Sequence, residues 1–186
     1  MDLAILLVNK LRGLPADTPL VGPIVPAPEL DARRASIEKR RLMTLEPSTR
    51  EFVMSILNWS RSRGIPTILG ETHRTLEDQT KAAKEGLTKI PEGQTGWHQY
   101  GRAFHLVIMD PRTKQLDRNA YRFVGEEVRR RGGEWLGDKP LMTKKGLVED
   151  LAHFEYHPGL KLSHYRDSSL ARKEMAMAER RAARYG

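Results

Sequence analysis

The chain has 186 residues, 39% of them hydrophobic and 30% charged, a balance that excludes a disordered chain and fits one domain with its own core. It contains no cysteine, which excludes disulfides and thiolate metal sites and leaves histidine and carboxylate as the strong metal ligands. The formal net charge of +8 predicts affinity for polyanions, among which nucleic acid, anionic phospholipid and acidic bacterial wall polymers are candidates.

The first 30 residues are predicted to form a proline-rich arm. A short helix is expected over residues 1–12, and residues 15–28, which hold five of the eleven prolines, are expected to be extended. The longest apolar run, residues 3–8, is far shorter than the about 20 residues of a membrane span. No basic segment precedes this run, as one does in a signal peptide. Any work outside the cytoplasm would therefore need a separate export route.

Helices and short strands alternate from residue 31 onward. Helical periodicity begins at Asp31, and a helix opened by Pro47 is expected to end near Gly64. A strand is predicted over 65–70, a helix over 76–87, a loop over 86–97 and the clearest strand of the chain over 103–109. A helix over 119–131 and a loop over 134–146 follow. Without a βαβ repeat, this order predicts an α+β domain with a small, largely antiparallel sheet flanked by helices.

Residues 166–186 carry six Lys or Arg against three Asp or Glu and are predicted to form a basic C-terminal helix of the same domain. In one interpretation this helix is solvated on its outer face and docked by Leu170, Met175 and Met177. In the other, it is a basic surface element that binds anionic wall polymers or outer-membrane lipid.

Three histidines stand in contexts that indicate metal binding. His98 and His105 lie in Gly-Trp-His-Gln-Tyr-Gly-Arg-Ala-Phe-His, and His153 lies in Asp-Leu-Ala-His-Phe-Glu, which begins at Asp150. Three protein ligands with a fourth position open to water form a catalytic zinc site. Asp150 is close enough along the chain to serve that water as a general base, although an aspartate can also cap a helix.

The remaining histidines, His73, His157 and His164, are expected to be packed or surface residues. His157 follows His153 by four residues, a spacing that can bind zinc on a helix, but Pro158 argues against a helix there. His157 is nevertheless the first alternative if one of the three motif histidines is not a ligand.

These segments resemble those of the M15 zinc peptidases, which include D-Ala-D-Ala carboxypeptidases and the L-alanyl-D-glutamate endopeptidases of bacteriophage lysins. Residues 96–105 stand where the lysins have Ser-x-His-x-x-Gly-x-Ala-x-Asp, and residues 150–155 match a later Asp-x-x-His-Phe-Glu-like element. Residues 70–79 and 132–138 are similar to two further segments of the family. The resemblance covers about residues 31 to 158 and implies a peptidase domain over 31–165.

Carried over position by position, the resemblance implies Zn²⁺ bound by His98, His105 and His153, with Asp150 as the general base. Arg74 and Gln79 would contact substrate, although Arg74 could instead pair with Glu71 or Asp78 on the surface. His105 takes the place of the family's aspartate ligand. Because Nδ1 has a reach comparable to that of an aspartate oxygen, coordination by His105 requires either an Nδ1 bond or a shift of the strand.

The resemblance implies a zinc metallopeptidase of the endolysin type, which degrades the bacterial cell wall by cutting a stem-peptide amide bond of peptidoglycan. Such a protein is made in the host cytoplasm and acts on the cell wall after release, and we expect it to be a monomer. The L-alanyl-D-glutamate bond is favoured. Two alternatives stay open: a catalytically inactive wall-binding or virion structural protein on the same fold, and a nucleic-acid-binding module driven by the net charge. No zinc knuckle, Gly-rich phosphate loop or interleaved aromatic–basic strand indicates specific nucleic-acid binding.

Overall fold

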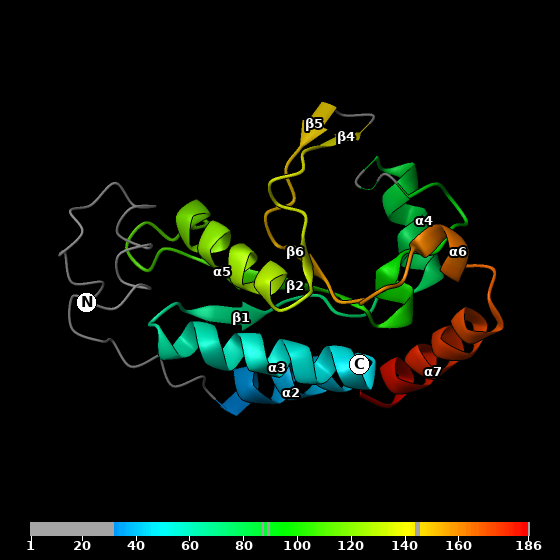
Figure 1. Ribbon diagram of the computed structural model, residues 1–186, viewed down its shortest axis with the longest axis horizontal. Coiled ribbons are helices and arrows are strands. Elements are labelled where there is room, and N and C mark those ends of the chain that lie inside the picture. Colours follow the sequence, from blue (N-terminus) through cyan, green and yellow to red (C-terminus); the bar gives the residue numbers. More distant parts are fainter. Residues whose placement is uncertain (1–31, 87, 89, 144–145, 186) are drawn as a thin grey trace.

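The computed structural model describes residues 32–185 apart from 87, 89, 144 and 145. The short helix and extended arm predicted for the first 30 residues lie outside this part. Helices surround a small sheet, and a separate two-stranded hairpin projects from the body (Figure 1). The elements in chain order are α2 Ala32–Thr44, α3 Pro47–Ser62, β1 Thr67–Leu69, α4 Leu76–Lys84, the 3₁₀ helix η1 Trp97–Tyr100, β2 Ala103–Ile108, α5 Arg118–Arg130, β3 Glu134–Trp135, β4 Leu141–Thr143, β5 Gly146–Val148, β6 His153–Glu155, α6 Leu162–Tyr165 and α7 Ser169–Tyr185.

The main sheet has the strand order β1-β2-β6-β3, and every pairing in it is antiparallel. Strands β4 and β5 pair with each other and form the projecting hairpin. The predicted α+β class with a small antiparallel sheet is confirmed. Among the described residues, no helix combines the length and the apolar composition that crossing a membrane requires.

The two faces of the main sheet differ in composition because side chains alternate along each strand. In β2, Phe104, Leu106 and Ile108 are fully buried and belong to the main hydrophobic core. This core also contains apolar side chains of α3 and α5, and the rings of Phe104 and Phe154 stack in it with centroids 5.7 Å apart. The intervening residue His105 therefore points to the opposite face, where the candidate site lies.

Capping residues fix where the helices begin. Glu46 accepts a hydrogen bond from the Thr49 amide at the start of α3, and Pro47 occupies the first helical position, as predicted. Thr75 caps α4 in the same way, by accepting from the Asp78 amide.

The loop predicted over 134–146 is wrong in part, because it contains β3 and β4. Strands of two or three residues are too short to show an alternating hydrophobic pattern. The predicted loop over 86–97 ends in η1, so His98 lies on a turn of 3₁₀ helix.

Helix α7 is confirmed, but two of the side chains expected to dock it are not in the interface. Leu170 is 49% exposed and Met177 43%, whereas Ala171 and Ala178 are buried. Of the three expected docking residues, Met175 packs against a buried cluster that includes Trp97 and Tyr100 of η1. Small alanine side chains let α7 approach the domain closely, and helical periodicity alone did not distinguish this face from its neighbour.

One buried ion pair connects α7 to the sheet and yields a stability prediction. Arg102, just before β2, donates from Nε and a terminal nitrogen to Glu174 at 2.9 and 2.8 Å, and its side chain is 10% exposed. Replacing Arg102 with alanine leaves the Glu174 carboxylate without these bonds, so we expect a loss of about 2 kcal/mol in the free energy of unfolding. Urea denaturation measures it, with Arg118→Ala, whose ion pair to Glu149 is exposed, as the control. Equal stability of the two variants would contradict the prediction.

Candidate metal centre

The helix η1 holds His98 in a fixed position against the rest of the domain. Gly101, which ends η1, has φ +69°, and a Cβ there would lie 2.9 Å from the Glu46 nitrogen, so this position requires glycine. The Gly101 carbonyl also accepts a hydrogen bond from the Glu46 amide at 3.0 Å. Buried Gln99 donates from Nε2 to the Arg74 carbonyl at 3.1 Å and so attaches η1 to the segment after β1.

The other two histidines come together because β2 and β6 pair in a single register. Ala103 lies opposite Glu155, Phe104 opposite Phe154, and His105 opposite His153. Directly opposed residues of an antiparallel pair extend their side chains on the same face at close range. Residues 48 positions apart in the sequence are thus placed side by side, and His105 Nε2 lies 3.2 Å from His153 Nδ1.

His98, His105 and His153 form one cluster. The ring centroid of His98 lies 5.0 Å from that of His105 and 5.1 Å from that of His153. One nitrogen from each ring can be chosen so that all three lie within 4.8 Å of one another, an arrangement that could hold a metal ion. The three residues predicted as ligands are therefore brought together by the fold.

Each histidine of the cluster has a partner for its outer nitrogen. His98 Nδ1 lies 3.1 Å from the Thr72 carbonyl, His153 Nε2 lies 2.9 Å from Glu155 Oε1, and His105 Nδ1 faces Glu71 Oε2 at 3.7 Å. Carbonyl and carboxylate oxygens only accept, so His98 carries its hydrogen on Nδ1 and His153 on Nε2. The lone pairs of His98 Nε2 and His153 Nδ1 are then directed into the cluster. Without a metal, His153 Nδ1 accepts a hydrogen bond from His105 Nε2 at 3.2 Å. Such outer partners fix the tautomer of metal-binding histidines.

The pKa values of His98 and His105 also favour metal binding by the cluster. Burial lowers the pKa of His98 well below its usual value, and repulsion from His153 and His105 lowers it further. The pKa of His105 is also lowered, by burial first and then by His153. Neutral imidazole is the form that binds metal, and both residues are held in this form.

The donor set suits a zinc ion. His98 is 4% exposed, and its Nε2 is buried with no hydrogen-bond partner among the described residues. A buried polar atom without a partner is costly unless a ligand completes it. Three imidazole nitrogens and no thiolate form a known catalytic zinc set. For His105 the atom nearest to His153 is Nε2, so the distal nitrogen faces the cluster rather than the Nδ1 expected from the length of an aspartate.

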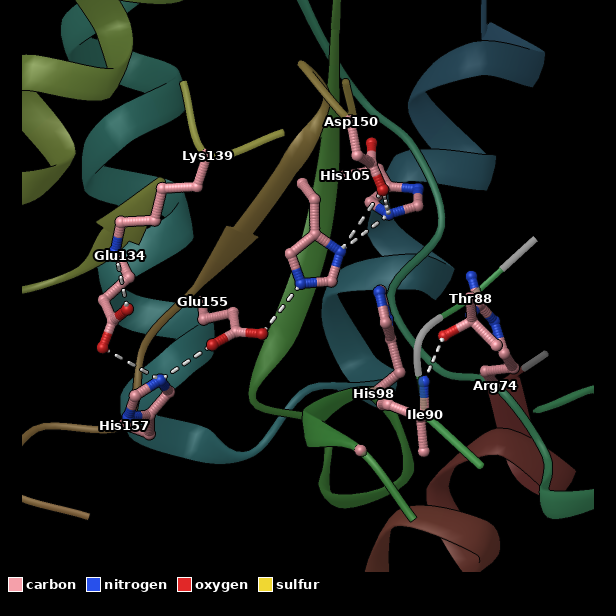
Figure 2. A network of polar contacts seen from close by, with 12 residues as sticks. Arg74, Thr88, Ile90, His98, His105, Glu134, Lys139, Asp150, Glu155 and His157 are labelled. Carbon is pink, nitrogen blue, oxygen red and sulfur yellow. Dashed lines mark hydrogen bonds and ion pairs between the residues drawn. The ribbon is translucent and has the colours of Figure 1, made fainter. Parts of the chain in front are cut away.

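Asp150 lies at the edge of the cluster, in a turn that leads into β6. Its Oδ2 is 3.9 Å from His105 Nε2 and 3.8 Å from His153 Nδ1, and its side chain is 35% exposed (Figure 2). The His153 amide donates to the Asp150 carbonyl at 3.2 Å, and no helix begins there, so the helix-cap alternative is wrong. With its Oδ2 less than 4 Å from two of the three histidines, Asp150 lies where a proton acceptor can reach a water molecule beside the cluster.

Arg74 and Gln79 lie beside the histidines and contact each other. The Arg74 guanidinium pairs with both carboxylate oxygens of Glu71 and donates to Gln79 Oε1 at 3.2 Å. Gln79 is 1% exposed and donates to Thr88 Oγ1 at 3.4 Å. The sequence left open whether Arg74 contacts substrate or pairs with a neighbouring carboxylate, and the structure shows the pair with Glu71. Contact of either residue with substrate stays a prediction.

Glu71, Thr72 and Glu155 are the residues of the site for which the sequence predicted no role in holding the histidines. The Thr72 contact comes from its backbone carbonyl, which no sequence pattern reveals. Glu71 is beside His105 because its carbonyl accepts from the His105 amide at 2.7 Å, which continues the pairing of β1 and β2. A signal for Glu155 was present, since residues two apart on a strand share a face and Glu155 follows His153 by two.

Comparison with known proteins gives a fold relationship. The sequence matches no protein-family model, and no curated protein matches it. The structure is similar to the crystal structure of Serratia marcescens L-Ala D-Glu endopeptidase ChiX, with a TM-score of 0.53 and 19% sequence identity, over 74% of this chain and 99% of that chain. At this identity the likeness shows a shared fold.

Proposed function

We propose that the chain is a zinc-dependent peptidase that hydrolyses a stem-peptide amide bond of peptidoglycan, the L-alanyl-D-glutamate bond. The observation that carries the proposal is the cluster of His98, His105 and His153, whose outer nitrogens are occupied and whose inner nitrogens converge. The proposed bond and the wall substrate are supported by the fold shared with an L-Ala D-Glu endopeptidase.

When bound at these histidines, zinc supplies a Lewis acid that polarises the scissile carbonyl and makes a water molecule more acidic. Asp150 accepts a proton from the attacking water at Oδ2 and delivers it to the leaving amine. Its exposure lets substrate and water reach it, whereas buried His98 only holds the metal. Arg74 lies close enough to lower the pKa of both His98 and His105, and it supplies positive charge beside the carbonyl oxygen that becomes negative.

Digestion of purified peptidoglycan tests this function. The zinc-loaded protein should release new amino termini of D-glutamate and new carboxyl termini of L-alanine, both identified by mass spectrometry, and a chelator should stop the release. New termini at another stem-peptide bond would change the assigned substrate. Binding to the wall without any new terminus would instead support the non-catalytic alternative on the same fold.

A pair of substitutions tests the role of His105. His105→Asp should retain zinc, because a carboxylate also binds this metal, whereas His105→Ala should bind zinc weakly and lose activity. The aspartate adds a negative charge at the metal, so water there ionises less readily and the pH optimum should move upward. Zinc content and the pH–rate profile of the three proteins are the measurements. An alanine variant with the zinc content and activity of the parent would show that His105 is not a ligand.

A further inference from the structure

A chain of polar contacts runs from the surface to one histidine of the metal centre. It begins at Glu134, which is 3.6 Å from His157 Nε2, and continues from this atom to Glu155 Oε2 at 2.9 Å (Figure 2). The second oxygen of the same carboxylate, Oε1, is 2.9 Å from His153 Nε2. Glu155 thus connects two imidazoles, one of the cluster and one outside it, and the three side chains are 11 to 15% exposed.

The hydrogen-bond partners of His157 determine which of its ring nitrogens carry hydrogen. Its Nδ1 lies 3.2 Å from the Leu160 carbonyl, and its Nε2 faces the Glu155 carboxylate. Both partners only accept, so both ring nitrogens carry hydrogen and the ring is positively charged. In agreement, burial lowers the pKa of His157, but the hydrogen bond to Glu155 and the charges of Glu155 and Glu134 together raise it overall.

The ring of His157 is held in place by η1. It stacks on Trp97 with centroids 4.2 Å apart and ring planes 11° apart. Trp97 is 5% exposed and directly precedes His98 in the sequence. The stacking and the Leu160 contact together aim Nε2 of His157 at the Glu155 carboxylate.

We propose that His157 is a positioning residue, which holds Glu155 so that Glu155 fixes His153 with hydrogen on Nε2 and presents Nδ1 to the metal. This inference rests on the zinc site of the proposed function. Without His157, the carboxylate loses one of the two side-chain donors that the described residues supply, and it can rotate away from His153. The neutral ring of His153 can then place its hydrogen on Nδ1, in the form that cannot bind metal there.

A second cation site is the competing explanation, because Glu134, Glu155 and His157 also offer ligand atoms within 4.8 Å of one another. The hydrogens assigned above argue against it, since a ring that donates from both nitrogens has no lone pair to offer a metal. The two explanations predict different metal stoichiometries.

Two variants of His157 separate the role of its N–H donor from the role of its stacked ring. His157→Phe retains a flat ring that can stack on Trp97 and removes both N–H groups, whereas His157→Gln retains a donor for Glu155 and removes the ring. His164→Phe, at an exposed histidine, is the matched control. We expect one zinc per chain in all four proteins, with affinity lowered roughly 10-fold in His157→Phe and partly restored in His157→Gln. Competition with a chromogenic chelator measures the affinity.

The tautomer of His153 gives a readout that needs neither metal nor activity. In long-range ¹H–¹⁵N spectra of the metal-free protein, His153 should carry hydrogen on Nε2 in the wild type and show a mixture of tautomers in His157→Phe. An unchanged tautomer together with zinc affinity within twofold of the wild type would overturn the proposal. Two zinc ions in the wild type and one in His157→Phe would overturn it in favour of a second cation site. Failure to bind any zinc would refute the proposed function, while the tautomer comparison would still test the positioning role.

Discussion

Replacing His98 with alanine is expected to lower zinc affinity by more than about 100-fold and to abolish peptidase activity, because even outer partners of metal ligands contribute 10- to 100-fold. His98 is the most buried of the three histidines, and in the part of the chain that the structure describes its Nε2 has no hydrogen-bond partner. With that nitrogen removed, two imidazoles of the cluster remain, fewer than the three protein ligands of a catalytic zinc site. Zinc content after dialysis, measured by atomic absorption, checks the expectation.

The exposed His164→Ala variant serves as the control and should bind zinc like the parent. Thermal unfolding of the metal-free proteins separates loss of the ligand from loss of the fold. Full zinc occupancy in a folded His98→Ala protein would contradict the assignment of His98.

The second large effect is expected at Asp150. Asp150→Asn should retain one zinc per chain and lose roughly 10²- to 10⁴-fold in turnover, since the amide keeps the shape of the side chain but cannot accept the proton. The side chain lies 3.8 and 3.9 Å from the inner nitrogens of His153 and His105 without belonging to the cluster. Turnover of a soluble stem peptide and zinc content are measured on the same samples.

Glu149→Gln is the matched control, because this neighbouring carboxylate pairs with Arg118 on the surface. It should leave both quantities unchanged. An Asp150→Asn variant with near-parental turnover would remove Asp150 from the proton transfer, and one without zinc would make it a ligand.

The sequence predicted that His98, His105 and His153 belong to one site, because the motif spacing and the strand pattern around His105 both indicate it. The alternating pattern of β2 directs His105 to the face of the sheet away from the core, whereas Phe104 faces the core. This pattern can be seen in the sequence alone. The nitrogen that each histidine directs inward was not predictable. It depends on the register of β2 with β6 and on acceptors such as the Thr72 carbonyl, which come from elsewhere in the chain.

Dependence on contacts from elsewhere in the chain also explains the errors in the predicted fold. The short strands β3 and β4 form by pairing with β6 and β5, so their own residues carry little pattern. The face of α7 that docks was predicted to be the one with large apolar side chains. The structure instead buries Ala171 and Ala178 and leaves Leu170 and Met177 exposed.

The most direct test of the central claim is a crystal structure of the protein grown with zinc, with data collected on both sides of the zinc absorption edge. We expect one anomalous peak at about 2.0–2.1 Å from His98 Nε2, His105 Nε2 and His153 Nδ1. Glu155 should remain bonded to His153 Nε2 in that structure, and Asp150 should stand outside the ligand set. A zinc ion held by other residues, such as Glu134, Glu155 and His157, with the three-histidine cluster empty, would contradict the account.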